Sequence, residues 1–467
     1  MVYSASVPAR APGLKMLRML TGAPGRLAYL APCHGGSHLP VSSSGVLQQR
    51  GLWVGSRREN FGVGRAGVLG FGLAGRVAAR KYSTHEEGLA KQLMSIPEVT
   101  DAQKLFDSGK FQMAQLALTR AVEIAESSRM PELMVLTAES LAHVYQVMGD
   151  FPKEQSERTR CCDILEEQLK SRDNNGESWP QEAYFRTLVQ SCLSDITMGS
   201  FDETKTAEAL EVCERLGRAE GVQLCGLIET LGTWATEGES DISLVAECEA
   251  TCAAKLGNTH TMSVQASLLH GMALQKLGHD DKALAILTAA AEATSSFSKL
   301  ESVGTKIEIL QRLVELSLKK KDGEAAKRHA SEALKAAEAV NSNEMIAACV
   351  HTLARVSIAQ GDFVVGEGLL RSCLGRMQVP KGASPSVWEL SLMQEATETY
   401  AGLLDQLIFN NNSRKAEGDM AREKLAAVEA ACPVTAEGAK RLRKAGLGHW
   451  YRRYLQPHVP LLLQDME

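Results

Sequence analysis

The chain of 467 residues has 51 basic and 56 acidic side chains, and 44% of its residues are hydrophobic. With only 14 prolines and long segments rich in Ala, Leu and Glu, it can bury an extended helical core. No stretch reaches the roughly 18 to 20 apolar residues that a membrane span needs, and the eleven cysteines lack paired spacing. The composition therefore argues against a membrane-spanning protein and against a disulfide-stapled domain, and it predicts buried, reduced thiols.

The segment 1–82 differs from the rest of the chain. It contains nine Arg and two Lys but a single acid, Glu59, among many Ser, Gly and Ala residues. This composition predicts a cleavable organelle transit peptide without a stable fold. The string from Arg80 to Ser83 resembles the pattern of arginine, any residue, aromatic and serine at which the mitochondrial processing peptidase cuts. We therefore expect a mature chain that starts at Ser83 in the mitochondrion, and in the matrix because the thiols are reduced; a chloroplast is the alternative.

Removing this leader changes the charge balance. Residues 83–467 keep 40 basic and 55 acidic side chains, and an acidic surface repels phosphate backbones. The strings 62–67 and 70–75 match the glycine fingerprint of dinucleotide-binding proteins, but no strand–helix unit surrounds them. No metal-ligand spacing and no catalytic constellation stands out. We therefore expect no cofactor, no metal and no enzymatic activity.

The stretch 268–290 shows the unit from which the chain is built. With Gly278 as a turn, Gly271 lies seven residues before it, Ala283 five after and Ala290 twelve after. Glycine ends a helix readily in the left-handed conformation, and small residues allow two helix axes to approach. These offsets predict a helical hairpin, and they resemble the tetratricopeptide (TPR) repeat.

Similar units recur along the chain, and each is expected to turn at a glycine. These turn glycines are Gly109, Gly149, Gly199, Gly238, Gly278 and Gly361, and the last interval is about twice as long as the others. The resulting period near 40 exceeds the roughly 34 residues of the standard TPR unit, so each helix should be about a turn longer. Glu154 occupies a position meant for a small residue, which predicts different packing of that return helix, and the sixth unit is expected to turn at Gly323. The predicted packing positions are Gly109, Ala114, Gly149, Gly271, Gly278, Ala283, Ala290, Ala326, Ala354, Gly361 and Gly366.

The resemblance implies an all-α fold, an α-solenoid of stacked antiparallel helical hairpins. We expect a leader over residues 1–82, the TPR-like array over 83–378, and a divergent helical cap with a basic aromatic tail over 379–467. Terminal repeats of a solenoid are often atypical because their outer face meets water.

TPR proteins bind protein partners on their concave face, which the resemblance implies here too. Co-chaperones of this family grip a terminal carboxylate with an asparagine six residues before the first turn glycine. Because Gln103, His143, Met272 and Arg355 occupy that offset, no such clamp is expected. The predicted groove mixes apolar and polar groups and suits a helix or an extended segment of a partner. It comprises Ile96, Val99, Gln103, Phe106, Leu136, Glu139, His143 and Gln146.

The C-terminus is basic and aromatic in an otherwise acidic chain. Its candidate lipid or anion patch comprises Arg441, Arg443, Lys444, Trp450, Arg452 and Arg453. Such a patch could bind an anionic lipid such as cardiolipin, or RNA. The alternative is a capping helix whose arginines pair with neighbouring acids.

Together these features predict a mitochondrial scaffold or adaptor that holds protein partners during assembly or maintenance of a larger complex, respiratory or ribosomal, or an accessory subunit of one. The alternative from another class is an RNA-associated factor in organelle gene expression. Helical-repeat RNA readers need a basic surface, which the net acidity disfavours.

Overall fold

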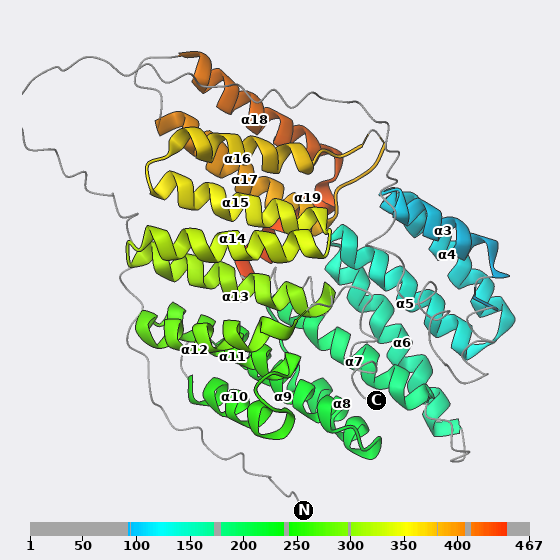
Figure 1. The fold of residues 1–467 in the computed structure, drawn as a ribbon. Helices are drawn as coiled ribbons and strands as arrows, with labels where there is room; N and C mark the ends of the chain where they lie inside the picture. Colours follow the sequence, from blue (N-terminus) through cyan, green and yellow to red (C-terminus); the bar gives the residue numbers. More distant parts are fainter. Residues whose placement is uncertain are drawn as a thin grey trace, which may run out of the picture. The chain divides into compact units, whose positions relative to one another are not determined.

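The computed structural model describes residues 92–93, 95–171, 179–237, 242–297, 300–380, 382–406 and 412–445. Within these ranges the chain forms 17 α-helices and one short 3-10 helix, and no strand (Figure 1). The helices are α3 (Pro97–Asp107), α4 (Phe111–Ser128), α5 (Pro131–Met148), α6 (Phe151–Ser171), α7 (Trp179–Met198), α8 (Glu203–Arg215), α9 (Ala219–Glu237), α10 (Ile242–Leu256), α11 (Thr261–Lys276), α12 (Asp280–Ala293), α13 (Leu300–Lys319), α14 (Gly323–Ala339), α15 (Asn343–Ala359), α16 (Phe363–Arg376), α17 (Val387–Gln406), α18 (Asn412–Ala431) and α19 (Pro433–Ala445). The predicted leader lies outside the described residues, as does the turn at Gly238.

Consecutive helices pack against each other in pairs, from α3 with α4 to α17 with α18, and each pair packs on the next. In Figure 1 the hairpins follow one another through the described unit in chain order. The predicted all-α array of stacked hairpins is therefore confirmed. Several helices are long: α5, α6 and α7 have 18, 21 and 20 residues.

The hairpin turns share one backbone geometry. Gly149 and Gly278 have positive φ angles of 74° and 78°. The N–H of the following residue closes the turn, as where His279 donates to the carbonyl oxygen of Leu274 at 2.9 Å. Glycine adopts this left-handed conformation without the steric penalty of a Cβ.

The sixth hairpin corrects the sequence prediction. Its left-handed residue is Lys321, with a φ of 60°, whereas the expected turn residue Gly323 is the first residue of α14. Asp322 donates its N–H to the carbonyl oxygen of Ser317 at 2.9 Å, as in the glycine turns. Its side chain also accepts from the N–H of Ala325 and caps α14. A good N-cap at Asp322 therefore fixes the turn just before it, on a lysine.

Small residues lie where paired helices cross. A Cβ on Gly271 would lie 2.5 Å from Cγ of Leu287, and one on Gly366 would lie 2.6 Å from Cγ1 of Ile358. The alanines at the corresponding positions of the other hairpins have almost no exposed surface; they are Ala114, Ala283, Ala290, Ala326 and Ala354. Larger side chains at these crossings would push the helix pairs apart.

The last helices return to the first ones. The hydrophobic core of α3 to α11 also contains Trp388 of α17 and Leu442 of α19. Both α17 and α19 pack on α5, and α19 also packs on α7. The contact is close, because a Cβ on Gly438 of α19 would lie 2.6 Å from the carbonyl oxygen of Gly149. The C-terminal helices thus cover the inner side of the second hairpin.

Packing also runs without a break from α16 to α17, across the predicted boundary at residue 379. A second hydrophobic core extends from α11 to α17. The division of the chain into an array over 83–378 and a cap over 379–467 stays a prediction.

Candidate protein-binding surface

The predicted groove residues of the first two hairpins lie mostly inside the protein. Seven of these eight side chains are buried, and only Gln103 is half-buried. Helix α5 is enclosed by α4, α6, α17 and α19, and 16 of its 18 residues are buried. An open groove at the α5 positions would require α17 and α19 to move away.

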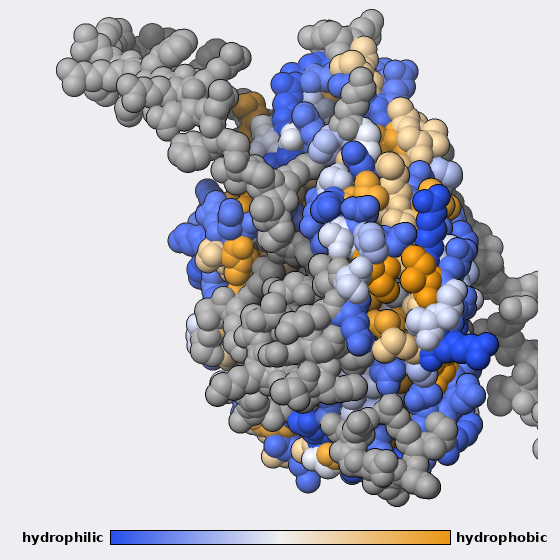
Figure 2. Space-filling view, turned by 90° about the vertical axis from the view of Figure 1, so that its right-hand side faces the viewer, coloured by the Kyte–Doolittle hydropathy of each residue, from blue (hydrophilic) through white to orange (hydrophobic). Residues whose placement is uncertain are grey.

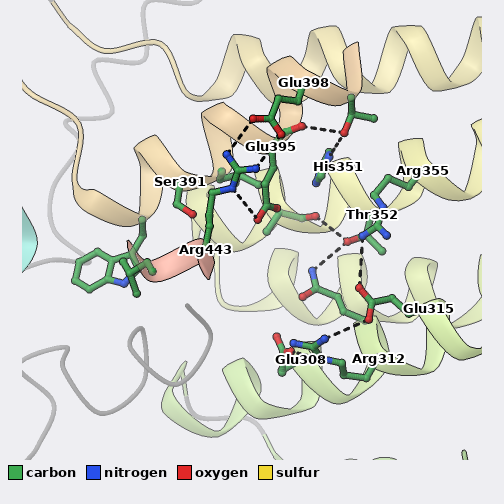
Figure 3. A pocket seen from close by; sticks show the side chains of 16 residues that line it. Glu308, Arg312, Glu315, His351, Thr352, Arg355, Ser391, Glu395, Glu398 and Arg443 are labelled. Atoms are coloured by element: carbon green, nitrogen blue, oxygen red, sulfur yellow. Dashed lines mark hydrogen bonds and ion pairs between the residues drawn. The ribbon is translucent and has the colours of Figure 1, made fainter. Parts of the chain in front are cut away.

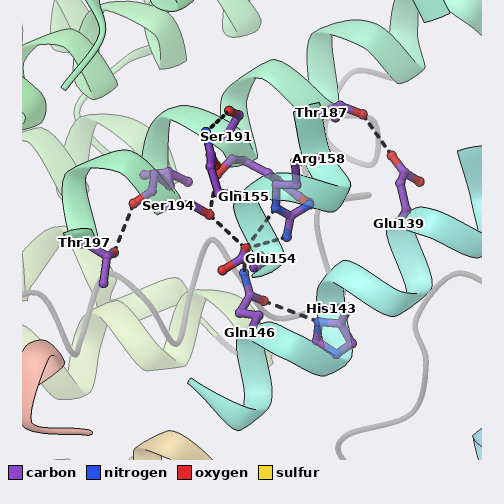
Figure 4. Close-up of polar contacts among 12 residues, drawn as sticks. Glu139, His143, Gln146, Glu154, Gln155, Arg158, Thr187, Ser191, Ser194 and Thr197 are labelled. Carbon is purple, nitrogen blue, oxygen red and sulfur yellow. Dashed lines mark hydrogen bonds and ion pairs between the residues drawn. The ribbon is translucent and has the colours of Figure 1, made fainter. Parts of the chain in front are cut away.

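A buried polar network fills the space between α5, α6 and α7 (Figure 4). Its centre is Glu154, whose Oε1 accepts hydrogen bonds from Gln146 Nε2 at 2.7 Å and from Ser194 Oγ at 2.8 Å. Arg158, which is 2% exposed, donates from Nε to the same oxygen at 2.9 Å and also bonds Gln190. A charged pair therefore joins the three helices at the position where a small residue was expected.

The environment of Glu154 is dry. Burial raises the pKa of its carboxyl above the usual range, although Arg158 and three hydrogen bonds oppose that rise. Its second oxygen, Oε2, has no hydrogen-bond partner. Helix α6 nevertheless packs along both α5 and α7, so the polar contacts replace the close approach of small residues and do not separate the helices.

Near this network, Glu139 and His143 also have polar partners. Glu139 of α5 accepts from Arg186 at 3.0 Å and from the Thr187 hydroxyl at 3.1 Å. His143 Nδ1 lies 3.3 Å from the side-chain oxygen of Gln146. Two polar members of the predicted groove are thus engaged inside the protein and are not presented to a ligand.

An open cleft lies on the other half of the array. Its volume is about 380 Å³, and side chains of α13, α15, α17 and α19 line it (Figure 3). Helices α13, α15 and α17 are the first helices of three successive hairpins. The cleft is therefore a feature of the inner layer of the solenoid, which these first helices form.

The cleft residues occupy equivalent positions in successive hairpins. Three rows of lining residues, evenly spaced along the sequence, are Glu308, Ala348 and Trp388; Gln311, His351 and Ser391; and Glu315, Arg355 and Glu395. Ala348, His351 and Arg355 precede the turn at Gly361 by the same offsets by which Leu136, Glu139 and His143 precede the turn at Gly149. The cleft therefore lies at the same hairpin offsets as the groove predicted on α5, but on the hairpins that begin with α13, α15 and α17.

Charged pairs line both walls of the cleft. On α13, Arg312 donates to Glu308 at 2.9 Å and to Glu315 at 3.2 Å. On the opposite wall, Arg443 of α19 donates to Glu398 of α17 at 2.8 Å. Glu395 lies farther away, at 4.0 Å from Arg443 Nε.

Uncharged polar groups connect these walls. Burial, with a smaller contribution from Arg355, lowers the pKa of His351 to about 4, so its imidazole is neutral at pH 7. Its Nε2 lies 3.1 Å from the Thr399 hydroxyl, which itself donates to a backbone carbonyl. We therefore assign the proton to Nε2. Gln311 donates to the Thr352 hydroxyl at 3.2 Å across α13 and α15.

The candidate lipid patch is only partly within the described residues. Arg441 pairs with Glu437 at 3.3 Å, and Arg443 pairs with Glu398. Both arginines thus meet neighbouring acids, as the capping alternative predicts. The side chain of Lys444 lies outside the described residues, as do Trp450, Arg452 and Arg453.

Large apolar side chains are exposed on four helices of the described chain: on α4 and α16, at Met420 of α18 and at Val434 of α19. Met113, Leu116 and Ile124 are exposed on α4, and Val364 is 83% exposed at the start of α16. Figure 2 shows hydrophobic residues among hydrophilic ones on the side of the molecule that lies at the right in Figure 1. Isolated exposures of this kind are common on protein surfaces and define no site by themselves.

Three further features concern the described part of the chain. The ten cysteines within it are free, and eight of them are buried. No group of three or more His, Cys, Asp and Glu side chains there could hold a metal ion. Of the helices that the structure describes, none is long and apolar enough to cross a membrane.

No family model matches the sequence, and no curated protein matches it. Solved structures with similar folds include BtubC (BKLC) from P. vanneervenii, with a TM-score of 0.29 and 15% identity over 59% of this chain and 94% of that chain. The apo form of RapI has a TM-score of 0.37 and 9% identity, over 71% and 99% of the two chains. Yeast Tom70 has a TM-score of 0.32 and 13% identity, over 76% and 88%.

The helices and turns themselves define the class of fold. Paired helices that stack in sequence, left-handed turns and small residues at the crossings make the described chain a TPR-like α-solenoid. Its distinctive features are the long period and the C-terminal helices that pack back on the second hairpin.

Proposed function

We propose that this protein is a scaffold or adaptor that binds a polypeptide segment of a partner in the cleft between α13, α15, α17 and α19. The observation behind this proposal is the even repetition of lining positions on three successive first helices. A surface of this kind offers a row of similar sites to an extended chain or a helix.

The proposed location is the mitochondrial matrix, and the proposed task is to hold partners in the assembly or maintenance of a larger complex, respiratory or ribosomal, or to serve in it as an accessory subunit. The Arg-rich, acid-poor leader and the string from Arg80 to Ser83 support the location. Amino-terminal sequencing of the protein from purified mitochondria should give Ser83. Recovery of the chain with its leader intact, outside mitochondria, would contradict this location.

Site-specific photo-crosslinking tests whether the cleft binds a polypeptide. A photoreactive amino acid replaces Ser391, which lines the cleft, in the full chain within cells that produce it. The control places the same group at Glu338, an exposed residue of α14 outside the cleft lining. We expect one discrete protein adduct at position 391 and none at position 338. Equal labelling at both positions, or none at 391, would reject the cleft as the binding surface.

The same experiment addresses the RNA alternative. Four carboxylates line the cleft, from Glu308, Glu315, Glu395 and Glu398, against three guanidinium groups. Phosphate groups would be repelled by this excess of acids. Adducts at position 391 that ribonuclease shortens would instead support an RNA-associated factor.

A further inference from the structure

We propose that the cleft receives a basic side chain, arginine or lysine, of the partner polypeptide, with Glu395 as its counter-ion. This inference rests on the proposed function and specifies the chemistry of the partner. It depends on which charges in the cleft already have partners, on how far each is exposed, and on the neutral groups between them.

Of the four carboxylates that line the cleft, Glu395 lies farthest from its arginine partner. Arg312 serves Glu308 and Glu315 on one wall, and Arg355 lies 3.6 Å from Glu315. On the other wall Arg443 makes a close, two-pronged contact with Glu398, at 2.8 and 3.1 Å. Since the nearest approach of Arg443 to Glu395 is 4.0 Å, Glu395 is the carboxylate that a new cation can best approach.

The exposed fractions of these side chains also favour the approach of a cation to Glu395. The side chains of Glu395 and Glu398 are 47% and 63% exposed, whereas that of Arg443 is 28% exposed. Glu308 and Arg312 lie deeper, with 6% and 19% of their side chains exposed. A ligand that enters between α15 and α17 therefore meets Glu395 and Glu398 on α17 and, on α15, the guanidinium group of Arg355, which is 45% exposed and lies 3.6 Å from Glu315, so the exposed carboxylates outnumber the one exposed cation. Opposite charges in such a partly solvated site attract, while a second carboxylate would be repelled.

The middle of the cleft suits a polypeptide backbone. Neutral polar side chains lie between the charged walls, among them Gln311, Thr352 and Ser391. The Thr352 hydroxyl already donates to Ala348 and accepts from Gln311, so it is Ser391 and the side-chain oxygen of Gln311 that can bond peptide groups without a change in charge. The volume of about 380 Å³ lies near the lower end of the range of roughly 300–1,000 Å³ for ligand sites. The cleft therefore fits a short stretch of chain with one long side chain, and not a globular surface.

The direct test uses the full chain and three labelled heptapeptides, acetylated and amidated, that differ only in a central Arg, Gln or Glu. Fluorescence anisotropy at low salt should show binding in the order Arg, Gln, Glu, and added salt should reduce the difference. Glu395→Gln should weaken the Arg peptide about two- to fivefold, the effect of one partly exposed ion pair, and leave the Gln peptide unchanged. The control Glu338→Gln makes the same charge change on α14, outside the cleft lining, and should have no effect.

The reversal variant Glu395→Lys should invert the order and favour the Glu peptide. Equal binding of the Arg and Glu peptides, or an unchanged affinity in Glu395→Gln, would overturn the proposal. If crosslinks at position 391 persist in that case, the polypeptide-binding function survives and only the basic specificity fails.

A truncated variant tests whether the cleft binds an external partner or the chain's own basic C-terminal sequence. Residues 446–467 include Arg452 and Arg453 and follow directly on α19, whose Arg443 lines the cleft. A variant that ends at Ala445 should bind the Arg peptide with the affinity of the full chain. A gain of more than about tenfold, equivalent to about 1.4 kcal/mol, would show that the chain's own segment competes for the cleft, and would overturn an external partner as its main occupant.

Discussion

The two halves of the inner layer differ at the hairpin position of His143, whereas the positions of Leu136 and Glu139, occupied in α15 by Ala348 and His351, are buried in both halves. In α5, Leu136, Glu139 and His143 are all buried. In α15 and α17, the equivalents of His143 are Arg355 and Glu395, which are exposed. The difference arises because α17 and α19 pack on α5, while the face of α13, α15 and α17 remains open.

This comparison shows that the position of a hairpin in the array, and not its repeat pattern, decides how much of its inner face is open to solvent. Where the face is covered, charges persist only within hydrogen-bonded networks, as around Glu154 and Arg158. Where it is open, charged pairs such as Arg443 and Glu398 stay partly solvated. The same residue types therefore contribute very differently to stability in the two halves.

The largest expected effect comes from breaking the covered pair. Glu154→Ala removes the carboxylate that pairs with Arg158 inside the protein and leaves a buried guanidinium group without a counter-ion. We expect a loss of about 3–5 kcal/mol in the free energy of unfolding, measured by urea denaturation of the full chain. The matched change in the open half, Glu395→Ala, should cost less than about 1 kcal/mol.

A double variant sharpens this result. Glu154→Leu with Arg158→Met removes both charges and keeps much of the volume, so it should recover most of the stability that Glu154→Ala loses. Equal losses in Glu154→Ala and Glu395→Ala would show that the two halves do not differ in burial as described.

The second prediction concerns His351, which belongs to the floor of the open cleft. Its folded pKa of about 4 lies below the value of roughly 6.5 expected in the unfolded chain. The unfolded state therefore gains protons first as the pH falls. The contribution of the neutral, buried His351 ring to the free energy of unfolding is therefore complete above about pH 6.5. It is lost as the pH falls toward 4.

We expect this loss to reach about 2–3 kcal/mol, measured as the change in unfolding free energy between pH 7 and 4.5. His351→Gln keeps a donor for Thr399 but has no titratable ring. This variant should therefore lose less stability than the wild type between the two pH values, by about that amount. If the unfolding free energies of the two proteins change in parallel with pH, His351 is as exposed to water as the residues at the rim of the cleft.

Much of the fold could be predicted from the sequence because hairpin chemistry is local. Gly278, Gly271 and Ala283 specify a turn and a close crossing within one stretch of the chain, and the structure has both. The turn at Lys321 was missed because a lysine at positive φ has no local sequence signal. The repeat period does indicate this turn, because a turn at Lys321 aligns the cleft residues of α13 with those of α15.

The open site was less predictable because it depends on contacts between distant parts of the chain. The offsets that define the predicted groove in α5 also define lining positions of the cleft in α15. Only the return of α19 to α5, from the far end of the described chain, decides that one face is covered. One signal was available in the run of small residues Ala436, Gly438 and Ala439, which predicts a helix that packs closely on another element.

The smallest of the three effects tests that contact between the two halves. A Cβ on Gly438 would lie 2.6 Å from the carbonyl oxygen and 2.7 Å from Cα of Gly149. Because backbone cannot rotate away as a side chain can, Gly438→Ala should cost about 1–3 kcal/mol and should speed hydrogen exchange in α5. The control Gly418→Ala in α18 meets only ordinary contacts, the nearest at 3.7 Å, and should add up to about 1 kcal/mol through helix propensity. If Gly438→Ala leaves stability and exchange unchanged, α19 does not hold α5 closed. The inner face at Leu136 and His143 would then be available to a partner, and the two halves would offer one continuous surface.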